Sequence, residues 1–321
     1  MMRHTNAIMT LLDWAQLGRY FVCVSLMGGI GFSGCTEGDG ETDSGAEDAG
    51  TTDGGTDGGM SQTITLNFRA AVNGADFACG AASGLGSTGE DVQLDGLRMF
   101  VSDVKLVAGD GEMIDAPIVA DDTWAQERVG LLDFEESCGD AGSAGTNSSV
   151  DVTVPAGDYT GVEFQLGLPF DLNHSDASST DAAAPLNNAA MFWNWQGGYK
   201  FLRLDMKTGA ETTTAWNVHL GSTMCTSDTA VTPPAMACAR PNLPTIALDS
   251  YDPKTQTIVF DAGSLLAGTD VTMDAMGTPS GCLSMPPDEA ECSDIFGRLG
   301  MDFATGACAD NCAGQQAFTV E

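Results

Sequence analysis

The stretch MFWNWQGGYKFLRLD, residues 191–205, concentrates aromatic side chains in a chain that otherwise has few of them. Two of the five tryptophans, Trp193 and Trp195, stand two positions apart within it. The Gly197-Gly198 pair that follows predicts a turn or bulge, because only glycine takes a positive φ without strain. From Tyr199 onward the side chains alternate in character, which is typical of a strand with one buried face. The stretch therefore predicts an aromatic block that is bent sharply before the chain enters a sheet.

Outward from this block, short alternating segments recur along most of the chain. Residues 62–72 and 97–107 alternate clearly, and an Asp-Gly pair at 110–111 predicts a hairpin turn after the second of them. Further strands are expected at 130–134, 150–154, 159–168, 199–206, 215–220, 245–248 and 257–261. Helical periodicity is scarce and gives only short turns at 264–267 and 294–299. This pattern predicts an all-β fold, an antiparallel β-sandwich with long disulfide-stapled loops.

The beginning of the chain has the features of an export signal. Arg3 and Arg19 supply positive charge, and the apolar run at 20–32 is too short for a comfortable transmembrane helix. The run ends in Phe-Ser-Gly-Cys35, which resembles a bacterial lipobox and predicts that Cys35 is the lipidated first residue of the mature protein. Signal-peptide cleavage nearby, with Cys35 as a free thiol, is the alternative. We therefore expect residues 1–34 to be a lipoprotein signal peptide. The mature protein would lie in the periplasm or at the cell surface, anchored to the outer membrane by lipid.

Charge separates the next two segments. Residues 36–61 contain eight acidic side chains and no basic ones, so residues 35–61 are expected to form a disordered acidic tether. Residues 62–321 are long enough for one well-filled core and form the predicted folded domain. That domain has ten Lys and Arg against 36 Asp and Glu. Nucleic acid is therefore excluded as a partner class, because phosphate contacts need basic clusters.

Eight cysteines remain in the domain, and an even number in an exported chain argues for disulfides. Sequence nearness favours Cys225–Cys238, Cys282–Cys292 and Cys308–Cys312, which leaves Cys79–Cys138 as a long-range pair. A thiolate metal site is the alternative. It is disfavoured because no C-x-x-C pair occurs and the expected compartment is oxidising.

The motifs of common enzymes are missing from the sequence. It contains no GxSxG, no P-loop, no dinucleotide fingerprint and no CxxCH haem attachment site. The domain keeps two histidines, His174 and His219, and they flank the aromatic block. Two imidazoles could bind a soft or borderline ion such as copper, whereas a structural role for each is the alternative. Met191 and Met206 could add thioethers, although methionine more often fills gaps in a core.

Several segments, in order along nearly the whole domain, resemble the MbnP family, which is also described as the four-Cys-motif member of the metallo-mystery pair. The aromatic block is the most specific part of the resemblance. The segments are VNGADFACG (72–80), LRMFVSDVKLV (97–107), VPAGDYTGVEFQLGLPFDLNH (154–174), PLNNAAMFWNWQGGYKFLRLD (185–205), WNVHLGSTMC (216–225) and GCLSMPPDEAEC (281–292).

The resemblance implies an exported copper-binding protein with a role in copper homeostasis, whose partner is a MauG-like diheme protein called MbnH. That partner oxidises a tryptophan to kynurenine, so this chain would be a substrate and not an enzyme. Carried over by position, Trp193 and Trp195 are the first candidates for modification, and Trp216 is the next. His174 and His219 would be the copper ligands.

Two alternatives from other classes remain. A surface adhesion or carbohydrate-binding module would stack exposed aromatics on sugar rings, which requires Trp193 and Trp195 to face solvent with no histidine near either. A Ca²⁺-stabilised domain is the third idea, based on acidic loops such as 109–115. That loop is equally well explained as a solvated hairpin.

Overall fold

The computed structural model describes residues 60–136, 138, 145–177, 182–194, 196–209, 214–229, 231–275 and 278–321. All of them belong to one compact unit, Thr56–Glu321. The predicted signal peptide, Cys35, the tether as far as residue 59 and Trp195 lie outside the described residues. No helix within the described ranges is long and apolar enough to span a membrane.

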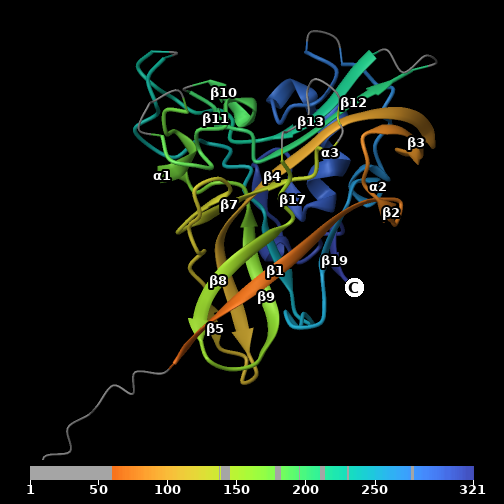
Figure 1. The fold of residues 1–321 in the computed structure, drawn as a ribbon. Coiled ribbons are helices and arrows are strands. Elements are labelled where there is room, and N and C mark those ends of the chain that lie inside the picture. Colours follow the sequence, from red (N-terminus) through yellow and green to blue (C-terminus); the bar gives the residue numbers. More distant parts are fainter. Residues whose placement is uncertain are drawn as a thin grey trace, which may run out of the picture. The chain divides into compact units, whose positions relative to one another are not determined.

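One long strand, β4 (Glu90–Ala108), is the spine of a ten-stranded sheet (Figure 1). The main path of this sheet runs β14-β9-β4-β12-β13-β16, while β3, β5 and β7 also pair with β4 and β6 pairs with β7. The bounds are β3 Gly80–Leu85, β5 Met113–Asp115, β6 Ala125–Gln126, β7 Val129–Asp133, β9 Tyr159–Leu166, β12 Leu202–Thr208, β13 Thr214–Leu220, β14 Thr245–Leu248 and β16 Gly281–Cys282. The predicted hairpin after residue 107 is confirmed, because β5 pairs back onto the end of β4.

A five-stranded sheet forms the second layer and joins the two ends of the domain. Its order is β19 (Phe318–Val320), β15 (Ile258–Asp261), β1 (Ser61–Val72) and β2 (Ala75–Asp76), with β8 (Ser149–Pro155) also paired to β1. Arg69 on β1 forms an ion pair with Glu321, its Nε lying 2.6 Å from Oε1. The first strand of the domain is therefore held by the last residue of the chain.

The expected strand directions need one correction. Most pairs are antiparallel, but β1 pairs with β15 in parallel, and so does β13 with β16. Parallel neighbours cannot be joined by a short hairpin, and both pairs join segments far apart in the sequence. Alternation within a segment predicts a strand but not the direction of its partner.

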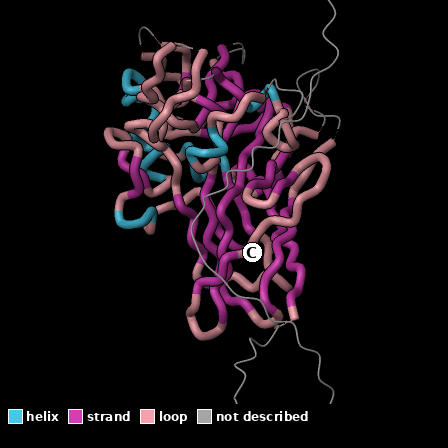
Figure 2. Tube along the Cα trace, turned by 90° about the vertical axis from the view of Figure 1, so that its left-hand side faces the viewer, coloured by secondary structure: helices cyan, strands magenta, loops and turns pink. Residues whose placement is uncertain are grey.

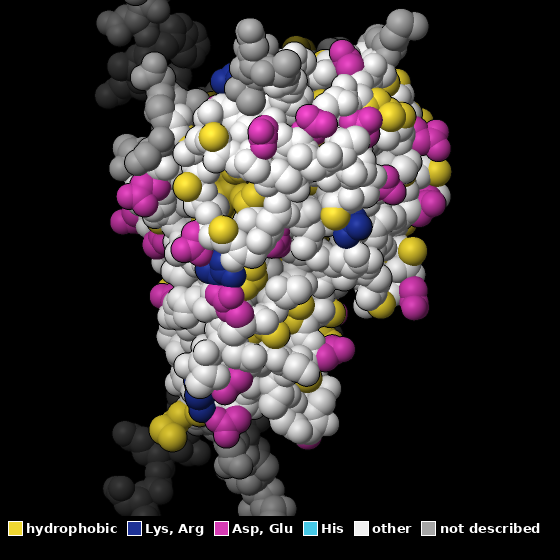
Figure 3. All heavy atoms as spheres, turned by 90° about the vertical axis from the view of Figure 1, so that its right-hand side faces the viewer, with side chains coloured by type: hydrophobic (Ala, Val, Ile, Leu, Met, Phe, Trp, Pro, Cys, Tyr) yellow, Lys and Arg dark blue, Asp and Glu magenta, His cyan; other side chains and the backbone are white. Residues whose placement is uncertain are grey.

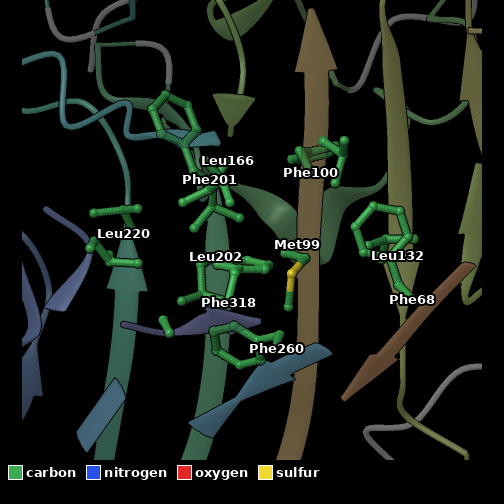
Figure 4. Packing of buried hydrophobic residues seen from close by; sticks show 14 of the residues in the cluster. Phe68, Met99, Phe100, Leu132, Leu166, Phe201, Leu202, Leu220, Phe260 and Phe318 are labelled. Carbon is green, nitrogen blue, oxygen red and sulfur yellow. The ribbon is translucent and has the colours of Figure 1, made fainter. Parts of the chain in front are cut away.

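Aromatic side chains from both sheets meet in the core (Figure 4). The ring of Phe164 on β9 packs edge-on against Phe68 of β1, at 5.7 Å between centroids, and against Phe318 of β19, at 5.6 Å. Phe260 of β15 contacts Phe318 in turn. All four side chains are buried. The predicted β-sandwich is therefore confirmed, since the inner faces of two sheets share one core.

Helices are short, and most of them lie toward one end of the molecule among the longer loops (Figure 2). The expected turns at 264–267 and 294–299 are helices α2 (Ala262–Leu266) and α3 (Glu289–Arg298), and both begin earlier than predicted. The other helical elements are α1 (Phe170–Asn173) and the 3-10 helices η2 (Ala189–Met191), η3 (Pro286–Asp288) and η4 (Asp310–Cys312). Two small hairpins complete the fold, β10 (Phe192–Asn194) with β11 (Gly198–Tyr199) and β17 (Met301–Asp302) with β18 (Ala307–Cys308).

All eight domain cysteines are in disulfides, so none offers a free thiolate to a metal. The pairs are the ones that sequence nearness favours: Cys79–Cys138, Cys225–Cys238, Cys282–Cys292 and Cys308–Cys312. Three of them close short loops, since their cysteines are 13, 10 and 4 positions apart.

Candidate metal and tryptophan site

The aromatic block forms the small hairpin β10–β11, with its bend at the predicted glycine pair. The backbone N–H of Gly197 donates to Asn194 Oδ1 at 2.7 Å, and Gly198 has a φ of +80°. A Cβ on Gly198 would overlap the carbonyl oxygen of Asn173. Two features therefore require a glycine at position 198: its positive φ and the close approach of α1.

Asn173, the last residue of α1, fastens this hairpin to the loop that carries the first histidine. Its side chain is buried, its Oδ1 accepts from the backbone N–H of Tyr199 at 2.9 Å, and its Nδ2 donates to the carbonyl of Gly197 at 3.3 Å. Sequence reasoning missed this residue. The one available signal was its position directly before His174.

His174 caps the C-terminal end of α1 and is buried beside a disulfide. Its Nε2 lies 3.3 Å from the Nδ2 of Asn173 and 3.7 Å from the Sγ of Cys238, and its ring meets Phe170 edge-on. The possible ligand atoms of His174, Cys225 and Cys238 all lie within 4.8 Å of one another. While the disulfide is closed, however, these sulfurs are not thiolates, so they pack against the imidazole instead of completing a metal site.

The second histidine lies against the same hairpin through Trp193. The ring centroids of Trp193 and His219 are 6.3 Å apart, and the planes are tilted by 58°. Trp193 is partly buried, and its six-membered ring covers Gly221, where a Cβ would come within 2.6 Å of Cζ3. The absence of a side chain at Gly221 therefore leaves room for the indole next to His219.

A buried carboxylate orients His219. Its Nε2 lies 2.6 Å from Oδ1 of Asp205, and both side chains are largely buried. Burial lowers the pKa of His219, and this effect exceeds the opposing influence of Asp205. The imidazole is therefore neutral at pH 7, with Nε2–H donating to the carboxylate and Nδ1 carrying no proton.

The Asp205 carboxylate belongs to a buried chain of charges that runs away from the site. Arg203 pairs with both Asp205 and Glu135, and Arg98 Nη2 lies 2.6 Å from the other oxygen of Glu135. Arg98 also pairs with Asp133 at 2.9 Å. Burial raises the pKa of Glu135 although both arginines act to lower it. Sequence reasoning also missed Asp205, but strand alternation does place it on one face with Arg203.

The remaining sequence candidates lie elsewhere. Trp216 is buried in the core, where its Nε1 donates to the carbonyl of Met273, and it faces away from His219 on β13. Met191 and Met206 are also core residues, as the alternative explanation of them predicted. The acidic hairpin at 109–115 contributes no three-residue ligand group among the described residues.

Trp193 also borders a cleft. The cleft has a volume of about 500 Å³ and lies between the hairpin and the loops at 222–225 and 279–286. The indole therefore lies beside His219 and is also accessible from this cleft.

The described residues thus bring each histidine against the β10–β11 hairpin, by different contacts. His219 contacts Trp193, whereas His174 is joined to the hairpin through Asn173 and through the Cys225–Cys238 disulfide, where Gln196 Nε2 donates to the carbonyl of Cys225 at 2.9 Å. Two imidazoles, one of them neutral and carboxylate-bound, fit the nitrogen ligands that copper prefers.

Comparisons with known proteins show the family and the fold of the chain. The model of the MbnP family matches residues 61–284. Among solved structures, the chain is similar to MbnP from Methylosinus trichosporium, with a TM-score of 0.69 and 29% sequence identity, over 81% of this chain and 98% of that one. No curated protein matches the chain.

Proposed function

Because this chain belongs to the MbnP family, we propose that it is an exported copper-binding protein with a role in copper homeostasis. We propose further that it is the protein substrate of a diheme, MbnH-like enzyme that oxidises one of its tryptophans to kynurenine. In this proposal the chain receives the modification and binds the metal, and the partner carries out the catalysis.

The observation that carries the proposal is the position of Trp193. Its ring is 6.3 Å from that of His219 and borders an open cleft. An external oxidant can therefore approach the indole from the cleft side, while any new ligand atom formed on the ring is close to an imidazole. Trp216 meets neither condition, since it is buried in the core. Trp195, which lies outside the described residues, stays a candidate by its sequence position.

The chemistry of the modification suits a metal site. Conversion of tryptophan to kynurenine consumes three waters, releases formate and gives up four electrons and four protons, which the haem partner and its peroxide accept. The product carries an aryl ketone and a free aniline in place of the indole. Both groups are potential ligands, whereas the indole nitrogen is a donor only.

Copper would be held by His174 and His219. A neutral imidazole is the form that binds metal, and the depressed pKa of His219 provides it at pH 7. The hydrogen bond from His219 to Asp205 fixes the ring orientation, as outer carboxylates do in many metal sites. A bound copper ion would supply a redox-active, soft-to-borderline centre at this position.

For localisation, we propose export by the signal peptide at 1–34 and lipid anchoring at Cys35. The acidic segment 35–61 would then act as the tether between the outer membrane and the domain. Labelling with a fatty-acid analogue, compared with Cys35→Ala, tests this part alone.

The first experiment is an intact mass and tryptic map of the protein isolated from cells that also contain the diheme partner. A gain of one oxygen with loss of one carbon on the peptide that holds Trp193 and Trp195 supports the proposal, and fragment ions then assign the residue. If every tryptophan is intact although the partner is active, the chain is not its substrate.

Copper binding is tested separately. His174→Ala and His219→Ala should each weaken copper binding in a competition titration with a chromophoric chelator. If both variants bind copper like the parent, the ligand assignment is wrong. The sugar-binding alternative is less well supported, because it requires aromatics with no histidine nearby and Trp193 has His219 beside it.

A further inference from the structure

The cleft beside Trp193 differs in charge from the rest of the chain. It is lined by apolar side chains, chiefly Trp193, Met224, Pro279, Leu283, Met285 and Pro286, and the remaining lining residues are polar or small. None of them is an Asp, Glu, Lys, Arg or His. The whole chain, by contrast, carries 45 acidic residues, and one face of the molecule shows acidic side chains spread widely across it (Figure 3).

Two methionines at this cleft are exposed to water. Met224 is 58% exposed and Met285 is 48% exposed, although methionine is usually found inside proteins. The backbone at or next to each methionine has a positive φ, which is uncommon for residues other than glycine. Met224 itself has a φ of +54°, and Ser284, directly before Met285, has a φ of +63°. Left-handed conformations at such residues cost free energy, so the surrounding structure must maintain them.

Buried polar contacts maintain this surface. The carboxylate of Asp288 accepts from the backbone N–H groups of Leu283, at 3.1 Å, and Met285, at 3.2 Å, and its side chain is fully buried. On the other wall, the backbone of Thr223 pairs with that of Arg240. The exposed thioethers therefore stand on a fixed framework and are not the ends of a loose loop.

We infer that this uncharged, methionine-rimmed cleft is the docking surface for the redox partner that takes electrons from Trp193. The inference rests on the proposed function and adds to it the face by which the partner binds. The partner would present an uncharged apolar surface above its haem edge. The four electrons of the oxidation pass from Trp193 to the acceptor one at a time, and four protons leave through solvent as three waters are consumed and formate is released.

Composition and distance favour this occupant. The buried centres of protein interfaces are depleted of charged residues and enriched in methionine and aromatic side chains, which describes this cleft. The partner must also come close to the ring that it oxidises. Since the cleft borders Trp193, a protein seated there is closer to this indole than one bound on the acidic faces. Binding through an uncharged surface should also depend only weakly on salt.

The test introduces charge at the rim without touching Trp193 or either histidine. Met224→Glu/Met285→Glu is compared with the parent and with Met113→Glu, a matched control because Met113 is 43% exposed on β5 and does not line the cleft. Affinity for the purified diheme partner is measured by calorimetry without peroxide. Oxidation rates are then measured with peroxide over a range of substrate concentrations.

We expect the double variant to raise the Kd and the KM at least tenfold with little change in kcat, and Met113→Glu to change neither. Copper binding and the melting temperature should be those of the parent. The inference is overturned if the parent does not bind the partner, if the double variant binds as tightly as the parent, or if Met113→Glu is impaired equally. Failure of the proposed function has a different signature, which is a partner that binds the parent but leaves every tryptophan intact.

Discussion

The two histidines of the site are held by different contacts. His219 lies on a sheet strand and is oriented by Asp205, at the end of a buried chain of arginines and carboxylates. His174 lies on a loop, where the side-chain amide of Asn173 and the Cys225–Cys238 disulfide lie against its ring. A network of ion pairs therefore supports the His219 half of the site, and an amide contact and a disulfide support the His174 half. The two halves should respond differently to mutation and to pH.

The largest effect is expected from removing the charge at the centre of the His219 side. Glu135→Ala leaves Arg98 and Arg203 buried without their shared carboxylate, which should destabilise the fold by about 3 to 5 kcal/mol. Urea unfolding measures the change. Asp158→Ala, which removes an exposed ion pair with Lys254, is the control and should have no measurable effect. If Glu135→Ala lowers the free energy of unfolding as little as Asp158→Ala does, the buried ion pairs do not stabilise the His219 half of the site.

A somewhat smaller loss of stability should follow from a substitution that separates the hairpin from α1, next to His174. Gly198→Ala forces a side chain onto a φ of +80° and into the carbonyl of Asn173, so we expect destabilisation of about 3 kcal/mol. Gly197→Ala is a close control, because the nearest atom to its Cβ would be 3.5 Å away. Equal stability of the two variants in urea would show that the close approach of α1 to the hairpin is unimportant.

Copper affinity should depend on the carboxylate that orients His219. Asp205→Asn keeps a hydrogen-bonding group beside His219 but removes the charge, and we expect copper to bind about 10 to 100 times more weakly. Competition titration measures the change. Asp95→Asn, which alters the ion pair with Lys207 instead, should leave affinity unchanged. Unaltered binding in Asp205→Asn would remove the carboxylate from the metal site.

The smallest effect concerns pH and the buried Glu135. Burial raises its pKa in the folded protein, so at pH values just above the ordinary glutamate range the folded state keeps a proton that the unfolded state has lost. The stabilisation that protonated Glu135 gives to the folded state is therefore fully present below the pKa of the unfolded state. It is lost as the pH rises through the pKa of the folded state. Glu135→Gln should remove that part of the pH dependence. Parallel stability curves for parent and variant would contradict it.

The strands of both halves could be predicted from sequence, but the contacts of the site could not. The expected strands at 245–248 and 215–220 match β14 in full and β13 in all but its first residue, because each strand buries one face. Alternation could not find β3, whose sequence GAASGL has no apolar alternation and is recruited by pairing with β4. The same limit applies to side chains. Asn173 and Asp205 make their contacts in the site only after folding brings separate segments of the chain together. A local sequence pattern does not show which segments pair or in what register.

The ion pair between Arg69 and Glu321 has a consequence for how the chain is made. The two residues are 252 positions apart in sequence, and β1 has its parallel partner in β15, also late in the chain. A ribosome that adds about 5 to 20 residues per second delivers Glu321 about 13 to 50 s after Arg69. During that interval β1 can pair with β8, but it lacks β15 along its other edge. One edge of β1 therefore stays unpaired during synthesis for longer than the edge of a strand whose neighbours in the sheet are also neighbours in sequence.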